Sequence, residues 1–205
     1  MDQHVEVIKL GGSLLNLKNL SEHLRRWTEF QPPCLRFWVV GGGQLVEAMR
    51  ELDATHHFDA QWMHWHCVDL LSSTARTLNQ LLPDFGYIAK QEELAAALHC
   101  LSSQNYIVAP GCFYSAESSS DLPNDWTTTT DSIAALLALT IEARKLVLLK
   151  SAAPPASTHN STFRDWSEKG FTDEAFPGIA QHLSCVEALN FRDWAQNHYN
   201  SSNCA

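Results

Sequence analysis

Short runs of β-branched and aliphatic residues recur along the chain, and a longer mixed segment follows each of them. Such runs are typical of strands in a parallel sheet, where both faces of a strand are covered. The predicted strands are residues 5–10, 35–40, 105–109, 145–150 and 185–189. Two stretches rich in Ser, Pro and Ala, residues 115–124 and 151–161, follow strands and are expected to be loops. Loops at the carboxyl ends of parallel strands are where ligands usually bind.

Between the predicted strands, apolar residues recur every three or four positions, which indicates helices. The residues that show this spacing are Leu17, Leu20, Leu24 and Trp27; Leu45, Ala48, Met49 and Leu52; and Ile133, Leu136, Leu137 and Thr140. Longer helices are expected over residues 59–82 and 91–101. Strands that alternate with helices predict an α/β fold, a three-layer α/β/α sandwich whose mostly parallel sheet is covered by helices.

Composition restricts the class of protein. The chain has 205 residues, 45 % of them apolar and 18 % charged, so it is expected to fold as a single domain with a sizeable core. Asp and Glu number 23 against 14 Lys and Arg, a formal net charge of −9. This balance argues against nucleic acid and membrane surfaces as partners. An anionic ligand must therefore be held by a local cluster of positive groups.

Cysteine and histidine usage gives no sign of a metal or disulfide framework. The six cysteines include no C-x-x-C pair. His64 and His66 lie two positions apart, which places them about 200° apart around a helix, so we expect no metal site there. No apolar run reaches the roughly 18 residues of a membrane-spanning helix, and no signal peptide is visible. We therefore expect a cytoplasmic protein.

The segment VIKLGGSLL is the first that carries chemistry. Its strand carries Lys9 near its end, the chain turns at Gly11 and Gly12, and Ser13 follows at a predicted helix start. Glycine lets backbone N–H groups approach an anion, and lysine adds a compact positive charge. The segment predicts a phosphate site, although an ordinary tight turn has the same pattern.

The segment WVVGGGQLVEAMR also has a glycine turn directly after a predicted strand. Gly41, Gly42 and Gly43 join a strand to a helix, whose positive end favours anions. Neither the G-x-G-x-x-G pattern nor the Walker pattern is present, which disfavours Rossmann dinucleotide binding and P-loop chemistry. Two glycine turns after consecutive strands indicate that two phosphate-like groups are bound, or else they are two ordinary tight turns without a ligand.

The segment PNDWTTTTDSIAALLAL brings four threonines, residues 127–130, and Asp131 to the start of an apolar helix. Taken alone, Thr130 or Asp131 reads as a helix N-cap. The predicted strand over 145–150 ends with Lys150, which taken alone reads as a solvated charge.

Taken together and in this order, the four segments resemble the amino acid kinase family, whose members transfer the γ-phosphoryl group of ATP to carboxylates, carbamate or phosphates. Within it, DWTTTTDSIAA and QWMHWHCVDLL are most similar to a small kinase of methanofuran biosynthesis that phosphorylates [5-(aminomethyl)furan-3-yl]methyl phosphate. The resemblance implies a carbamate kinase-like fold, with an acceptor-binding part over about 1–125 and a shortened nucleotide-binding part over about 126–205. It also implies ATP and Mg²⁺ as cofactors and a role in C1-carrier metabolism.

The same resemblance implies roles for single residues. Lys9, Asp131 and Lys150 would be catalytic, with Lys9 on the transferring phosphoryl group and Asp131 orienting the lysine. The nucleotide would be bound by Gly11, Gly12, Ser13, Thr129 and Thr130. The acceptor would be bound by Gly41, Gly42, Gly43, Arg50, His64 and Arg76. Either arginine could equally be a surface residue, and His64 could instead pack at an interface.

Two further expectations come from the comparison with the family. Relatives pair through the helix that corresponds to residues 59–82, which implies a homodimer or a higher homo-oligomer. Where the family usually has an acidic T-D-V-D-G-V turn, this chain has KSAAPP over residues 150–155. The alternative is therefore a degenerate, non-catalytic relative that binds nucleotide or another anion within a complex.

Overall fold

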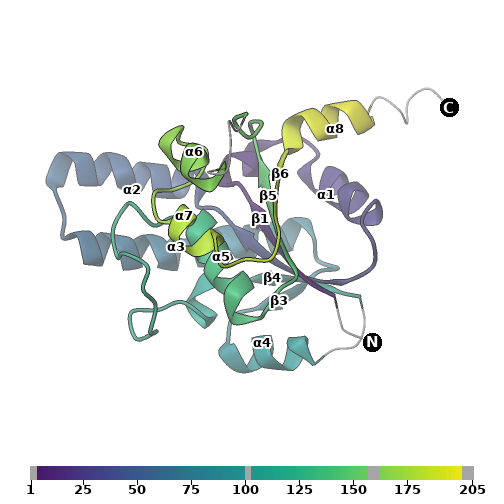
Figure 1. The fold of residues 1–205 in the computed structure, drawn as a ribbon, viewed down its shortest axis with the longest axis horizontal. Coiled ribbons are helices and arrows are strands. Elements are labelled where there is room, and N and C mark those ends of the chain that lie inside the picture. Colours follow the sequence, from purple (N-terminus) through teal and green to yellow (C-terminus); the bar gives the residue numbers. More distant parts are fainter. Residues whose placement is uncertain (1–3, 100–102, 157–161, 200–205) are drawn as a thin grey trace.

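A computed structural model describes residues 4–99, 103–156 and 162–199. Within them, parallel strands form one sheet in the order β3-β4-β2-β1-β5-β6 (Figure 1). The strands are β1 (Val5–Leu10), β2 (Leu35–Val40), β3 (Gly86–Ile88), β4 (Asn105–Val108), β5 (Lys145–Lys150) and β6 (Val186–Asn190). The α-helices are α1 (Leu20–Glu29), α2 (Gly43–His56), α3 (Ala60–Leu81), α4 (Gln91–Leu98), α5 (Thr130–Thr140), α6 (Thr162–Glu168), α7 (Phe176–Ala180) and α8 (Phe191–Tyr199). Two short 3₁₀ helices are η1 (Gly12–Asn16) and η2 (Pro110–Cys112).

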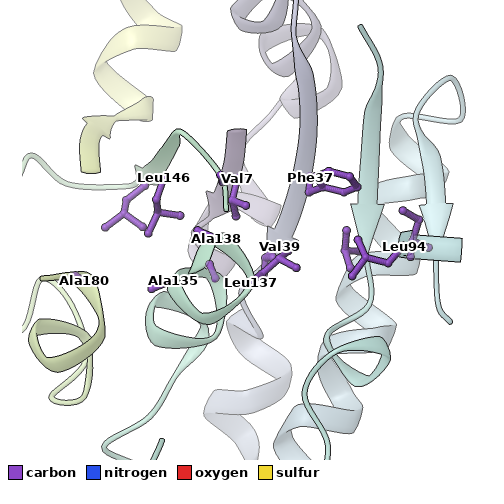
Figure 2. Packing of buried hydrophobic residues seen from close by; sticks show 14 of the residues in the cluster. Val7, Phe37, Val39, Leu94, Ala135, Leu137, Ala138, Leu146 and Ala180 are labelled. Carbon is purple, nitrogen blue, oxygen red and sulfur yellow. The ribbon is translucent and has the colours of Figure 1, made fainter. Parts of the chain in front are cut away.

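Helices cover both faces of the sheet, which confirms the predicted three-layer sandwich. On one face, strand residues such as Val7 and Phe37 pack against α4, α5, α6 and α7 (Figure 2). On the other face, Ile8 and Trp38 pack against α1, α3 and α8. Successive strand residues point to opposite faces, so a strand that is apolar at every position buries both sides. Five of the six residues of β2 are apolar and are buried for this reason, and the sixth, Arg36, is buried in an ion pair with Glu6.

The predicted strands and long helices are confirmed to within a few residues. The helix predicted over 59–82 is α3, and the helix predicted over 91–101 ends at Leu98. Leu17 lies before α1, because Asn19 takes a left-handed conformation and the helix begins at Leu20. Residues 115–124 form the expected loop, and of the loop predicted over 151–161, residues 157–161 lie outside the described residues. The three-residue strand β3 and the short helices α6, α7 and α8 were not predicted.

Helix α2 departs from the expected covering layer. None of its residues is buried, and Leu45 and Leu52 are 48 % and 46 % exposed. It runs beside the first half of α3 at one end of the molecule (Figure 1). The regularly spaced apolar residues of α2 therefore face solvent and α3 rather than the sheet.

The two glycine turns pack backbone against backbone, at the carboxyl ends of β1 and β2. Leu10 is paired with Val40, so the turns start side by side. A Cβ atom on Gly12 would lie 2.1 Å from the backbone nitrogen of Gly43, and one on Gly41 would lie 2.6 Å from that of Gly12. Gly43 also has a φ of +56°, which disfavours any other residue. Glycine is thus needed for the close approach of the two turns.

Substituting Gly12→Ala is expected to lower the free energy of unfolding by about 2 kcal/mol or more, because two backbones must separate to admit the methyl group. Gly111→Ala is the matched control, since a Cβ atom there meets nothing within 4 Å. Urea denaturation of both variants measures the difference. Equal stability of the two variants would contradict the packing argument.

Candidate functional site

A buried cluster of two lysines and one aspartate lies where the carboxyl ends of β1 and β5 meet the amino end of α5. Lys9 Nζ lies 2.7 Å from Asp131 Oδ1, and Lys150 Nζ lies 2.7 Å from Asp131 Oδ2. The side chains of Lys9 and Asp131 are 6 % and 5 % exposed, and that of Lys150 is 15 % exposed. These three residues, predicted from three separate segments, therefore meet at one point.

The cluster carries a surplus positive charge in a dry environment. Burial alone would raise the pKa of Asp131, but Lys9 and Lys150 outweigh it and lower that pKa, so the carboxylate stays ionised. Each ammonium has three donors; Lys150 donates one to Asp131 Oδ2, and Lys9 forms an ion pair with Asp131 Oδ1. The remaining donors suit an anion with several oxygens, such as a phosphate group.

The glycine turns border this cluster. A Cβ atom on Gly11 would lie 3.7 Å from the Cα of Lys150, and one on Gly41 would lie 3.2 Å from Thr130 Oγ1. The first N–H groups of η1 and α2 have no acceptor within their own helices. Ser13 is exposed, and its hydroxyl donates a 3.0 Å hydrogen bond to that of Ser151. The sequence-predicted residues Gly11, Gly12, Ser13, Gly41, Gly42 and Gly43 thus line one edge of the sheet together.

Asp173, which sequence reasoning missed, holds the amino end of α5. Its carboxylate accepts hydrogen bonds from Thr129 N at 2.9 Å, Thr129 Oγ1 at 2.8 Å and Ser132 N at 3.1 Å, and from the hydroxyl of Ser132. It also accepts a bond from Phe176 N at 2.9 Å. Burial and the charge of Asp131 raise the pKa of Asp173, while these hydrogen bonds act in the opposite direction. Asp173 is more than 40 residues in sequence from Thr129 and Ser132, the residues that it binds at the amino end of α5, so no local pattern links them.

A small cavity of about 50 Å³ lies between α2, α3 and the segment that precedes α5. Apolar side chains make most of its wall, with Trp126 on one side. Its lining consists of Gly42, Val46, His64, Cys67, Val68, Leu71, Asp125, Trp126, Thr128, Thr129, Thr130 and Ile133. The hydroxyl of Thr128 is buried and has no hydrogen-bond partner among the described residues. The cavity suits a small, mostly apolar group with one hydrogen-bonding atom.

Trp126 is fixed at the cavity by two neighbours on α2. Its indole N–H donates a 2.6 Å hydrogen bond to Asp53 Oδ2, and the guanidinium of Arg50 lies 4.0 Å from the ring centroid. The segment DWTTTTDSIAA, on which the family resemblance rests in part, includes this tryptophan, but the resemblance assigned it no role. Its position shows that the predicted Arg50 lies beside the cavity, stacked on a lining residue.

Of the other two residues predicted to bind the acceptor, His64 lines the cavity and Arg76 does not. His64 lines the cavity, but its Nδ1 lies 3.2 Å from Asp125 O and its Nε2 lies 2.8 Å from Tyr114 Oη. Burial lowers the pKa of His64, so it serves as a neutral link between α3 and the loop above it. Arg76 is exposed on α3 and is not among the residues that line the cavity. Helix α3 is long, and Arg76 falls beyond its cavity-lining half.

Thr129 and Thr130 lie at the junction of cluster and cavity. The hydroxyl and N–H of Thr129 both donate hydrogen bonds to Asp173, so this hydroxyl helps to hold the amino end of α5. Thr130 is buried beside Gly41. In the described ranges, no three His, Cys, Asp or Glu side chains gather in a way that could hold a metal ion. No helix in those ranges has the length and apolarity needed to span a membrane.

Anion binding at this cluster is expected to depend on pH. Burial and the charge of Lys9 lower the pKa of Lys150 from 10.5 to about 8, although Asp131 and Asp173 raise it. A bound polyphosphate favours the protonated lysine, so binding should take up a proton and weaken as the pH rises through about 8. Calorimetric titration with tripolyphosphate from pH 7 to 9.5, in buffers of different ionisation enthalpy, measures both effects.

Lys150→Arg supplies the control for this pH dependence. Arginine stays protonated throughout the range, so the variant should bind without proton uptake near pH 8. The same proton uptake in the variant as in the wild type would assign the titration to another group.

Comparison with known proteins gives a family match and a fold match. The model of the "Amino acid kinase family" matches residues 5–153. The structure is similar to the UMP kinase from Ureaplasma parvum, with a TM-score of 0.63 and 15 % identity over 93 % of this chain and 91 % of that chain. It is also similar to the uridylate kinase from Archaeoglobus fulgidus, with a TM-score of 0.61 and 15 % identity over 93 % of each chain. For the UMP kinase from Bacillus anthracis, the TM-score is 0.64 and the identity 13 %, over 92 % of this chain and 87 % of that chain. None of the curated protein sequences matches this chain.

Proposed function

Because this chain belongs to the amino acid kinase family, we propose that it is an ATP-dependent phosphotransferase that acts on a small phosphorylated alcohol. The observation that carries the proposal is the buried cluster of Lys9, Asp131 and Lys150 beside two glycine turns. Phosphoryl transfer requires positioning and charge neutralisation more than a covalent nucleophile. The cluster offers both.

The residues present fit the phosphates of a nucleotide. Lys9 and Lys150 have free donors, and the turn at Gly11 and Gly12 has no side chains that would keep a phosphate away. Lys9, Lys150, Gly11, Gly12 and Ser13 would hold ATP, which supplies the phosphoryl group. Since both oxygens of Asp131 face lysines, Mg²⁺ would be bound chiefly by phosphate oxygens and water.

The chemistry of the site favours an acceptor whose attacking oxygen is already ionised. Among the described residues at the site, Asp131 faces two lysines, Asp173 accepts five hydrogen bonds, and His64 uses both ring nitrogens. None of these groups is placed to remove a proton from an alcohol. A phosphate monoester needs no such base, and Lys9 and Lys150 would stabilise the charge that develops during transfer.

The cavity supports a compact acceptor. Its volume of about 50 Å³ corresponds to about four water-sized groups. Its apolar lining suits a small ring, and Arg50 at Trp126 provides a cation beside it for an anionic substituent. These features agree with an aminomethylfuran phosphate as the acceptor, in the synthesis of a methanofuran-type C1 carrier. The UMP kinases share the fold, and a nucleoside is much larger than this cavity.

One observation favours a second candidate function. After β5 the chain reads Ser151, Ala152, Ala153, Pro154 and Pro155, with no carboxylate in this turn. A site that keeps its phosphate cluster but has lost groups for the nucleoside would bind an anion without turnover. The alternative is therefore a non-catalytic subunit that binds nucleotide or anion within a complex.

Calorimetric titration with Mg-ATP, followed by an acceptor panel, tests the proposal. We expect Mg-ATP binding and ADP release that depends on a phosphate monoester, with the aminomethylfuran phosphate preferred over UMP, acetate and carbamate. Turnover with UMP alone would overturn the proposed acceptor. Binding of Mg-ATP without turnover of any acceptor would favour the non-catalytic alternative.

We also propose a homodimer that pairs through α3 and the adjacent α2. Leu45 and Leu52 on α2, Phe58 in the turn between the helices and Trp62 on α3 are between 40 % and 50 % exposed, and such apolar surface is typical of interfaces. Light scattering is expected to give twice the monomer mass. A monomer at micromolar concentration would refute the pairing.

A further inference from the structure

The described structure places a second carboxylate behind the lysine cluster. Asp173 comes from the turn before α7, and it belongs to none of the glycine, threonine or lysine motifs of the sequence. It is partly buried, it makes no ion pair with a described residue, and it accepts all five of its described hydrogen bonds from N–H and hydroxyl groups of Thr129, Ser132 and Phe176. A buried carboxylate that is satisfied in this way is costly to place and is held firmly.

These hydrogen bonds replace the cap that α5 lacks. Thr129 is the N-cap residue, but its side chain makes no capping bond within the helix. The first N–H groups of a helix need outside acceptors, and a negative charge at that end is favourable. Asp173 meets both needs from 41 to 44 residues away in sequence. The contacts between α5 and α7 bring it there.

The position of Asp131 depends on this cap. Asp131 lies between Thr129 and Ser132, the two residues whose backbone N–H groups Asp173 binds. A rotation or shift of the first turn of α5 would therefore move the carboxylate that faces Lys9 and Lys150. A misplacement of about 1 Å can reduce activity by about a hundredfold.

We propose that Asp173 is a positioning residue that fixes the first turn of α5, so that Asp131 holds Lys9 and Lys150 at the phosphate site. The effect of Asp173 on catalysis rests on the proposed function, whereas its effect on the positions of Lys9 and Lys150 does not. Asp131 faces the two ammonium groups, and Asp173 holds the end of α5 that carries Asp131. The turn before α7, which carries Asp173, thus contributes to the same site as the two glycine turns.

Two measurements on Asp173→Asn test this proposal, with Glu174→Gln as the matched control. Glu174 is the exposed neighbour of Asp173, so its variant removes the same charge without touching α5. The first measurement is the pH dependence of Lys150 acetylation, followed by mass spectrometry. The second is the affinity for tripolyphosphate by calorimetry. Both use the full chain.

In Asp173→Asn, we expect Lys150 to become reactive at a lower pH than in the wild type, because the charge of Asp173 helps to keep this lysine protonated. We also expect tripolyphosphate to bind about tenfold more weakly, since the amide cannot accept all the bonds of the carboxylate. The control should match the wild type in both measurements.

A lowered melting temperature with unchanged Lys150 reactivity and unchanged affinity would overturn the proposal and leave Asp173 a structural cap. If Asp173→Asn does not fold, Ser132→Ala removes one hydroxyl donor to Asp173 and should show the same two effects more weakly. Failure of the wild type to bind tripolyphosphate would count against the proposed function. The reactivity of Lys150 would still decide the role of Asp173.

Discussion

Replacing Lys9 by methionine is expected to reduce phosphotransferase activity by about 10²- to 10³-fold, the effect of removing one preorganised group that stabilises transition-state charge. Methionine has a similar shape, and Asp131 keeps its second partner, Lys150, at 2.7 Å. The fold should therefore survive while the charge at the end of β1 is lost. Steady-state kinetics and Mg-ATP calorimetry measure the loss of turnover and of affinity.

Lys18→Met serves as the matched control for this variant. Lys18 is exposed a few residues after the same glycine turn, so the substitution removes an equal charge from the same segment. Its activity should equal that of the wild type. If Lys9→Met retained full activity, Lys9 would have no part in the transfer, and the role of the cluster would have to be reassigned.

The second large effect is expected for Asp131→Asn, which should lower the free energy of unfolding by about 3–5 kcal/mol and abolish activity. The variant leaves two ammonium groups facing each other in a buried site without their shared carboxylate. Breaking a buried ion pair is costly because the remaining charge stays desolvated. Urea denaturation at pH 7 measures the loss of stability.

The pH dependence of this loss provides an internal check. The pKa of Lys150 is already lowered to about 8 in the wild type, and without Asp131 it should fall further. The variant should therefore regain part of its stability as the pH rises from 7 to 9, because its lysine can shed the proton. Asp69→Asn, which removes an exposed carboxylate on α3, should lose little stability at any pH. Equal losses in the two variants would contradict the buried cluster.

The architecture of the protein could be predicted largely from its sequence. Runs such as LRFWVV are apolar at every position but one, and only a strand covered on both faces buries them all. Helical spacing is also a local signal, which placed α3 to within one residue at each end. Short elements fared worse, because the three residues of β3 and the five of α7 are too few to show a period.

Among the site residues, those carried on glycine and lysine motifs could be predicted. Gly12 and Gly41 stand at strand ends, and parallel strands bring their carboxyl ends to one edge, so the meeting of the two turns follows from the order of elements. The sequence alone also identified Lys9, Asp131 and Lys150, with the family resemblance to connect them. Their ion-pair distances required the structure.

What only the tertiary structure decided are the contacts made between distant segments. Asp173 reaches the amino end of α5 across more than 40 residues, and Arg76 lies outside the cavity-lining part of α3, although each looks ordinary in its own segment. His64 is engaged by Tyr114 and Asp125, which lie 50 and 61 residues away. Periodicity and turn chemistry act over a few residues and are written in the local sequence. The partners of a buried polar group are chosen by packing, which depends on the whole chain at once.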